Sequence, residues 1–180
     1  MSKPIFVVLL LFTCFIVEAK EWNHSSGSYK AHRYFEGNQI TPSNIDDLER
    51  VWKFSSRKDE ILTVQSSPIY TGTQIISSFP RSIFAIDPVS GVLNWEIELK
   101  YTINPRGITF TANPSRRIFI PTQKGVLELD ETNGSIIGYF KSGQTSLPPV
   151  IHKNNIIVAT LHDGIKAFDL TSRELIWHLS

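Results

Sequence analysis

A sequence motif that occurs twice in this chain constrains its fold more than any other feature. It reads IFAIDPVSGVLNWEIEL at residues 83–99 and IKAFDLTSRELIWHL at residues 165–179. Each copy carries an Asp followed at the same distance by a Trp, and between the copies VLELDETNGSIIGYF places Asp130 at the equivalent position. A period of about 40 residues built from short β-type runs is typical of propeller blades, because helical repeats of that length show a 3.6-residue periodicity instead.

Each period divides into four runs rich in β-branched and aromatic residues, separated by short turn segments. The runs are SSPIYT, QIISSF, SIFAID and VLNWEIEL in the first period, GITFTA, RRIFIPT, VLELD and SIIGYF in the second, and SLPPVI, NIIVATL, IKAFD and ELIWHL in the third. Four short strands with tight connections make one antiparallel blade. The sequence therefore predicts an all-β region over 55–180 with three four-stranded blades at 66–99, 107–140 and 146–179.

The third run of every period ends in Asp and leads into a four-residue turn. The carboxylate can accept hydrogen bonds from backbone N–H groups of the turn, and Gly91 and Gly134 can adopt a positive φ there at little cost. Arg173 stands at the glycine position of the third turn, which predicts a different turn geometry. The repeated aromatics Trp95 and Trp177 are expected to be buried between neighbouring blades.

The N-terminus has the composition of a secretory signal peptide. Lys3 precedes a mostly apolar, uncharged run over residues 5–17, and small side chains lead to a cleavage position after Ala19. The run is too short for a membrane-spanning helix, which needs roughly 20 apolar residues. Residues 1–19 are therefore predicted to be a signal peptide, and the mature chain to be exported to a periplasm or secreted, with no transmembrane segment. Its single cysteine, Cys14, lies inside the signal, so the mature chain cannot form a disulfide.

Charge and histidine spacing exclude two classes of function. With 18 basic and 17 acidic residues, the chain has no electrostatic signature of a nucleic-acid-binding protein or of one that binds anionic membranes. The five histidines show no spacing typical of metal ligands, so no metal site is predicted.

A leader over residues 20–54 precedes the blades. In it, Thr41 can cap a short helix that begins at Pro42. The following RVWKF at 50–54 has the pattern of a fourth blade strand without its first three. We therefore expect a short helix and then an orphan strand ahead of the first blade.

These motifs resemble the pyrroloquinoline-quinone (PQQ) propeller repeat, in which a strand ending Ala-x-Asp is followed by a turn and by a Trp in the next strand. The leader resembles that of quinoprotein alcohol and sugar dehydrogenases at Trp22, Arg33, Tyr34, Gln39, Ile40, Asn44, Leu48 and Trp52. The resemblance implies an eight-bladed ring closed by the N-terminal strand. On that basis the chain is interpreted as the N-terminal part of such a ring, with about three of its blades.

The resemblance also implies candidate cofactor contacts. Gln65 stands where the family has an acid, Arg106 matches an arginine that contacts the quinone, and Thr145 lies near a hydroxyl contact. PQQ with calcium is the implied cofactor. The insertion that carries a calcium-binding Glu is missing from the third period, and the vicinal disulfide of alcohol-oxidising members cannot form. The family's catalytic Asp would lie beyond Ser180, so no catalytic or metal-binding residue is predicted here.

Two functions remain open at this point. The first is an exported dehydrogenase that oxidises a small alcohol or sugar through PQQ and passes electrons to an acceptor. The second is a non-catalytic propeller of the same repeat that binds proteins as a scaffold, as in outer-membrane protein assembly. Arg106 and the leader favour the dehydrogenase, whereas Gln65 and the missing calcium-binding Glu favour the scaffold.

Overall fold

The computed structural model describes residues 22–27, 30–35, 37–55, 66–103 and 106–180. Two predictions lie outside these residues: the signal peptide over 1–19 and the contact at Gln65. The elements are η1 (Ile45–Asp47), β1 (Ile69–Tyr70), β2 (Ile75–Phe79), β3 (Ser82–Ile86), β4 (Leu93–Glu98), β5 (Thr109–Thr111), β6 (Arg117–Thr122), β7 (Gly125–Asp130), β8 (Ile136–Phe140), β9 (Val150–His152), β10 (Asn155–Ala159), β11 (Ile165–Asp169) and β12 (Leu175–Leu179).

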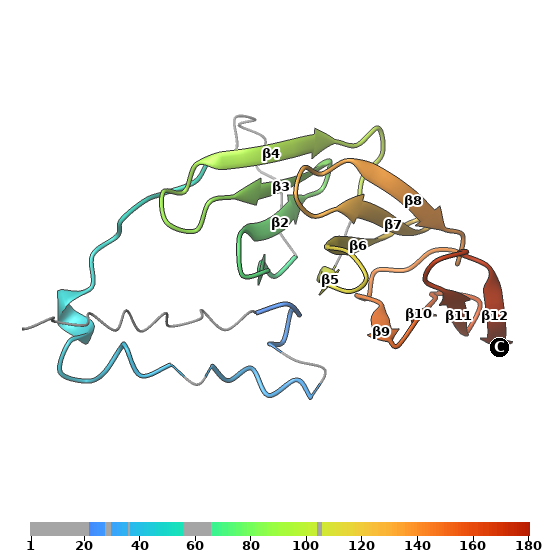
Figure 1. Cartoon of the computed structure of the whole chain (residues 1–180), viewed down its shortest axis with the longest axis horizontal. Coiled ribbons are helices and arrows are strands. Elements are labelled where there is room, and N and C mark those ends of the chain that lie inside the picture. The colour runs from blue at the N-terminus through green and yellow to red at the C-terminus, as the bar shows by residue number, and fades with distance from the viewer. Residues whose placement is uncertain (1–21, 28–29, 36, 56–65, 104–105) are drawn as a thin grey trace, which may run out of the picture.

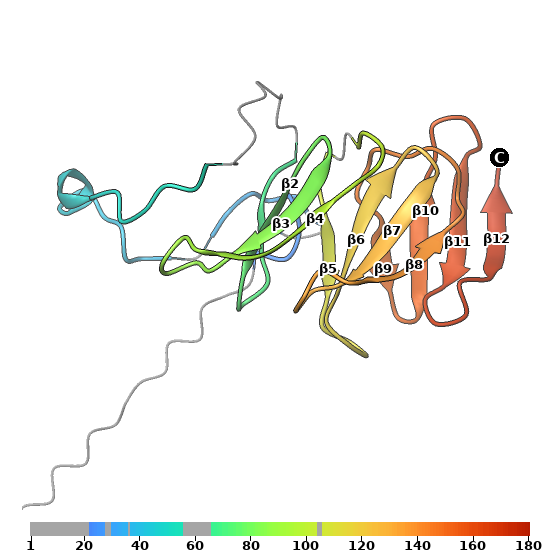
Figure 2. The same cartoon turned by 90° about the horizontal axis from the view of Figure 1, so that it is seen from above.

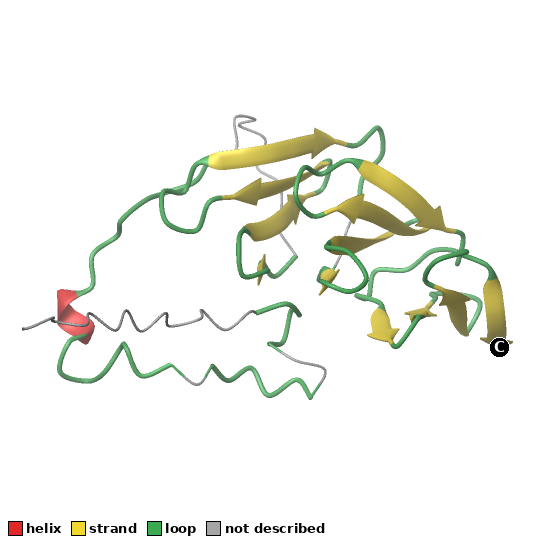
Figure 3. Cartoon of the chain, in the orientation of Figure 1, coloured by secondary structure: helices red, strands yellow, loops and turns green. Residues whose placement is uncertain are grey.

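The strands form three four-stranded antiparallel sheets, each built from four consecutive strands in sequence order. We call them blade 1 (β1 to β4), blade 2 (β5 to β8) and blade 3 (β9 to β12). Figure 1 and Figure 2 show the blades side by side in an arc, with the last strand of each blade on the outer side. Figure 3 shows that strands and loops make up nearly all of the described chain. The predicted all-β fold with four-stranded blades is confirmed.

The Asp turns follow the predicted chemistry. Asp87 Oδ1 accepts hydrogen bonds from the backbone N–H groups of Val89 at 3.0 Å and Ser90 at 2.6 Å. Both bonds recur at Asp169, which accepts from Thr171 and Ser172, and Asp130 accepts the first of them, from the Thr132 N–H. These backbone donors lower the pKa of both Asp87 and Asp169. The turn backbone therefore favours the ionised form of Asp87 and of Asp169.

The different geometry predicted for the turn at Arg173 is wrong. Arg173 has a φ of 63°, close to the 69° of Gly91 and the 75° of Gly134. In all three turns the N–H at this position donates to the carbonyl of the turn Asp at 2.9 Å. A non-glycine residue in the left-handed region is uncommon. Its strain is offset by contacts that its side chain makes with blade 2.

Tryptophan side chains dock one blade on the next. The Trp95 indole Nε1 of blade 1 donates to the Glu131 carbonyl of blade 2 at 3.0 Å. Its ring covers Gly134 so closely that a Cβ at that glycine would lie 2.5 Å from it. Trp95 also packs against the apolar core between blades 1 and 2. The predicted packing role of Trp95 is confirmed, with the side chain half-buried.

Burial of Trp177 is not observed, because no blade of the described chain follows β12. The side chain is 42% exposed. Its cross-strand neighbour is Ala167, as Ala85 is the neighbour of Trp95, so its position within the blade is equivalent. The burial of the repeated Trp is therefore a property of the blade interface, not of the blade itself.

Between blades 2 and 3, an ion pair takes the place of the tryptophan contact. At the Trp position blade 2 has Gly138, which faces Glu128 across the sheet. Arg173 of blade 3 reaches over this glycine, and its Nη2 and Nε lie 2.7 Å and 2.9 Å from Glu128 Oε2. Glu128 is fully buried and also pairs with Arg117 at 2.7 Å. A second apolar core fills the remaining space between blades 2 and 3.

The leader differs from its prediction in regular structure but not in its contact with blade 1. Instead of a helix beginning at Pro42, it has one 3-10 turn, η1, with Asn44 at its N-cap position. The Asn44 side chain makes no capping bond to this turn and instead accepts the N–H of the preceding Thr41 at 2.7 Å. Residues 50–54 do not form the expected orphan strand. Trp52 nevertheless docks like a blade tryptophan: its Nε1 donates to the Pro88 carbonyl at 3.1 Å and its ring covers Gly91.

Within the described part of the chain, no helix is long and apolar enough to cross a bilayer.

Candidate cofactor-binding site

Arg106 lies just before β5, at the side of the arc formed by the first strands of the blades. Its backbone N–H donates to the Ser146 carbonyl at 2.8 Å, which ties the entry of blade 2 to the entry of blade 3. The next residue, Gly107, is buried against Ser25 and Pro148 and has no room for a side chain. The Arg106 side chain itself is exposed. The backbone is thus fixed while the guanidinium is available to a ligand.

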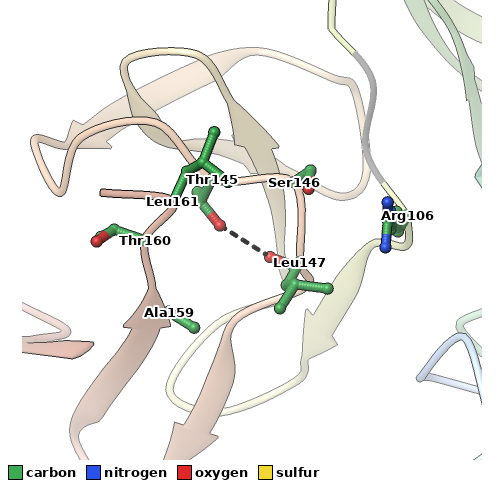
Figure 4. Close-up of a pocket in the computed structure, with 7 residues that line it drawn as sticks. All are labelled: Arg106, Thr145, Ser146, Leu147, Ala159, Thr160 and Leu161. Carbon is green, nitrogen blue, oxygen red and sulfur yellow. Dashed lines mark hydrogen bonds between the residues drawn. The ribbon is translucent and has the colours of Figure 1, made fainter. Parts of the chain in front are cut away.

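Arg106 and Thr145 line one pocket of about 190 Å³. Its other lining residues are Ser146, Leu147, Ala159, Thr160 and Leu161, all from blade 3 or the segment before it. Figure 4 shows Arg106 on one side of this pocket and the blade 3 residues on the other. The structure therefore brings two of the three predicted contacts, Arg106 and Thr145, to one site.

The Thr145 hydroxyl is less available than the resemblance implies. The residue is buried, and its Oγ1 donates to the Leu147 carbonyl at 3.4 Å (Figure 4). Its backbone N–H donates to the Thr122 carbonyl at 3.1 Å. With the hydroxyl proton engaged, Thr145 can offer a ligand an acceptor oxygen.

A second pocket of about 340 Å³ shares Arg106 with the first. Its other lining residues are Trp22, Ser25, Ser26, Arg33 and Ser67. We call it the leader pocket, because four of these residues come from the leader. Sequence reasoning missed them as site residues. Trp22 and Arg33 were recognised as part of the leader pattern, but nothing in their spacing indicates that they face Arg106.

The residues that line the two pockets carry groups that can bind a planar anion. A guanidinium offers a planar fork of donors to carboxylates or paired carbonyl oxygens. Hydroxyl groups and the Trp22 indole supply further polar and flat apolar surface. Among the residues that the structure describes, no group of three or more His, Cys, Asp or Glu is placed to hold a metal ion.

Comparison with known proteins gives relatives that share this fold. The chain is 25% identical over 162 residues to the quinoprotein glucose dehydrogenase of Gluconobacter oxydans, covering 73% of this chain and 20% of that protein. Among solved structures it is similar to a europium-containing methanol dehydrogenase, with a TM-score of 0.71 and 21% identity over 88% of this chain and 31% of that one. The chain thus spans less than a third of the length of these two proteins.

Two further structures share the fold at lower sequence identity. The quinohemoprotein alcohol dehydrogenase of Comamonas testosteroni matches with a TM-score of 0.71 and 20% identity, over 90% of this chain and 27% of that one. BamB from Moraxella catarrhalis matches with a TM-score of 0.52 and 14% identity, over 68% of this chain and 38% of that one.

A family profile covers most of the blades and the leader. Residues 22–160 match the family described as "PQQ: Glucose/ethanol/alcohol dehydrogenase, beta-propeller domain". The matched range includes the leader pocket, Arg106 and Thr145, all of blades 1 and 2 with their Asp turns, and the first two strands of blade 3. This chain therefore belongs to the PQQ β-propeller domain family of glucose, ethanol and alcohol dehydrogenases.

Proposed function

We propose that this chain supplies the first blades of an exported quinoprotein dehydrogenase that oxidises an alcohol or sugar with PQQ. The observation that carries the proposal is Arg106, whose exposed guanidinium lines both pockets while its backbone is anchored to Ser146. The similarity to glucose, methanol and alcohol dehydrogenases supports the substrate class. The substrate, the electron acceptor and export all belong to this proposal.

When bound, the quinone supplies the redox chemistry by taking two electrons and two protons from the alcohol, which becomes a carbonyl compound. The residues of this chain bind and orient it. Arg106 offers a fixed positive charge, Thr145 an acceptor oxygen at the rim of the same pocket, and Gln65 is proposed as a neutral hydrogen-bonding contact. Calcium, in this proposal, is held by residues other than those described.

The test is a PQQ titration of the full chain with calcium present, followed by calorimetry. Hydrogen bonds to charged groups contribute about 1.5–3 kcal/mol, so Arg106→Ala should weaken binding about ten- to a hundredfold. Arg50→Ala is the matched control, because Arg50 is an exposed arginine that lines neither pocket. Equal affinity of the Arg106 and Arg50 variants would refute the role of Arg106.

A protein-binding scaffold is the second candidate function. The outer strand β12 leaves four large apolar residues exposed, namely Leu175, Ile176, Trp177 and Leu179. An uncovered apolar strand is a surface on which another protein segment can pack. Absence of any PQQ binding by the wild-type chain would favour this function over the dehydrogenase.

A further inference from the structure

Among the described residues, the leader pocket is lined by positive charge and hydroxyl groups and by no acid. Arg33 and Arg106 both line it, together with the three serines Ser25, Ser26 and Ser67. Within the described residues, neither guanidinium has a hydrogen bond or ion pair from its side chain. Two unpaired guanidinium groups beside hydroxyl donors form a site for an anion with more than one carboxylate.

The first part of the leader is held across two blades. The backbone N–H groups of Trp22 and Tyr70 each donate to the other residue's carbonyl at 2.9 Å, which pairs the leader with β1. Two residues later, His24 forms an isolated bridge with Thr109 of β5. The leader therefore crosses the inner strands of blades 1 and 2, and its position depends on both.

A tight turn presents the leader serines to the pocket. The Gly27 N–H donates to the His24 carbonyl at 2.8 Å, and the Ser26 N–H donates to His24 Nδ1 at 3.2 Å. Gly27 has a φ of 79°, and the Trp22 ring lies 2.8 Å from where its Cβ would be, so only glycine fits there. The Arg33 N–H donates to the Ser26 carbonyl at 3.2 Å, which brings Arg33 back to the same turn.

Arg33 has a φ of 50°, in the left-handed region that non-glycine residues seldom adopt. Strained backbone of this kind occurs often at binding sites, where the surrounding structure holds a side chain in place. Here the strain accompanies an exposed guanidinium at the wall of a polar pocket.

We propose that Arg33 is a second cationic contact for a polycarboxylate ligand, so that the leader is part of the binding site and not only a ring closure. This inference rests on the proposed function, under which the ligand is the carboxylate edge of the quinone. Arg106 lines both pockets, so a planar ligand bound at Arg106 adjoins the leader pocket. Its carboxylates are then shared between a blade arginine and a leader arginine.

The experiment titrates the full chain with PQQ and separately with citrate, a tricarboxylate without a quinone ring. Arg33→Asn removes the charge and keeps a residue that tolerates a positive φ, whereas Arg33→Lys keeps the charge. We expect Arg33→Asn to weaken binding of both probes about ten- to a hundredfold. Arg33→Lys should recover part of that loss, and Arg50→Asn should have no effect.

Two further readouts separate a binding role from a structural one. The thermal unfolding midpoint of Arg33→Asn should equal that of the wild type, because the side chain is exposed. Trp22 lines the pocket, so PQQ should change the tryptophan fluorescence of the wild type, and Trp22→Phe should reduce that change.

The outcomes distinguish this inference from the proposed function. If Arg106→Ala weakens PQQ binding and Arg33→Asn does not, the leader contact is overturned while the proposed function stands. If PQQ does not bind but citrate binds in an Arg33-dependent way, the leader pocket is a polycarboxylate site and the proposed function fails. If neither probe binds the wild type, both are overturned.

Discussion

At the residue scale, Glu131 shows how a carboxylate is kept charged inside a blade interface. It follows the blade 2 turn Asp, is 1% exposed, and accepts hydrogen bonds from Arg116 Nε at 2.8 Å and from the Thr71 hydroxyl of blade 1. Burial raises the pKa of Glu131, but these hydrogen bonds and the Arg116 charge outweigh burial and lower it below the ordinary value of 4.5. The side-chain links from Glu131 to Arg116 and Thr71 are therefore strongest when the carboxyl is ionised.

The lowered pKa predicts acid sensitivity. A carboxyl whose pKa is lower in the folded state stabilises the fold above its unfolded pKa, and this stabilisation is lost as the pH falls below about 4.5. Glu131→Gln should therefore cost about 1–3 kcal/mol at pH 7 and much less at low pH. Urea unfolding at pH 7 and pH 3 measures the difference, with the exposed Glu174→Gln as control. A Glu131 effect that is equal at both pH values would contradict this account.

At the element scale, the blade interfaces are built in two ways. At the first two, a tryptophan covers the glycine of the next turn: Trp52 covers Gly91 and Trp95 covers Gly134. Between blades 2 and 3 the sizes are reversed, because Gly138 stands at the tryptophan position and Arg173 at the turn glycine position. The arginine brings its charge to Glu128. The same interface geometry thus accepts a tryptophan or an arginine as the large residue, provided that the residue opposite it is glycine.

Trp95 and Trp177 occupy equivalent positions in two blades, so Trp177 is a control for substitutions of Trp95. Trp95→Ala should destabilise the chain by about 3 kcal/mol, because it removes a packed aromatic side chain and its hydrogen bond to Glu131. Trp177→Ala at the equivalent position should change stability by less than about 1 kcal/mol, because Trp177 has no following blade to cover in the described chain. Thermal and urea unfolding of both variants tests this contrast. Equal losses would show that the tryptophan acts within its own blade.

The reversed sizes at the interface between blades 2 and 3 predict that substitutions of Gly138 and Arg173 are energetically coupled. Gly138→Trp alone should be destabilising, because Arg173 lies over Gly138 and would have to move away from Glu128 to make room. Adding Arg173→Gly restores the order found at the other interfaces and leaves Glu128 paired with Arg117. A double-mutant cycle should therefore give a favourable coupling energy of about 1–3 kcal/mol. Additive effects of the two substitutions would rule out the size exchange.

At the scale of the whole molecule, apolar burial is concentrated between blades. One core lies between blades 1 and 2 and the other between blades 2 and 3. The outer face of blade 3 is the exception, since β12 is exposed along its whole length. Over the described residues, this face leaves apolar surface in contact with water.

For a protein made of residues 1–180 alone, that surface predicts self-association. We expect sedimentation velocity to show concentration-dependent association at micromolar concentrations, because an exposed apolar strand promotes pairing with other chains. Trp177→Lys should reduce the association without lowering the unfolding midpoint. Val51→Lys, at an exposed valine of the leader, serves as the control. A monomer at all concentrations would contradict the prediction.

The sequence by itself determined the blades, because each strand and turn depends on neighbours close in the chain. Alternating β-branched runs specified the strands, and the turn aspartates specified hydrogen bonds two or three residues away. The same local logic failed at Arg173. Arg173 adopts a left-handed φ and pairs with Glu128 of another blade. No pattern in the sequence near Arg173 predicts that partner.

Only the tertiary structure decided which distant residues lie side by side in the pockets and blade interfaces. Arg106 was predicted from the resemblance of its Arg-Gly pair to the family pattern. Arg33 lies more than 70 positions earlier and lines the same pocket only because the leader crosses β1 and β5. Whether a repeated tryptophan is buried was likewise decided by the presence of a following blade, as Trp95 and Trp177 show. Local sequence sets backbone conformation and hydrogen bonding, whereas burial and the meeting of charges depend on segments that are distant in the chain.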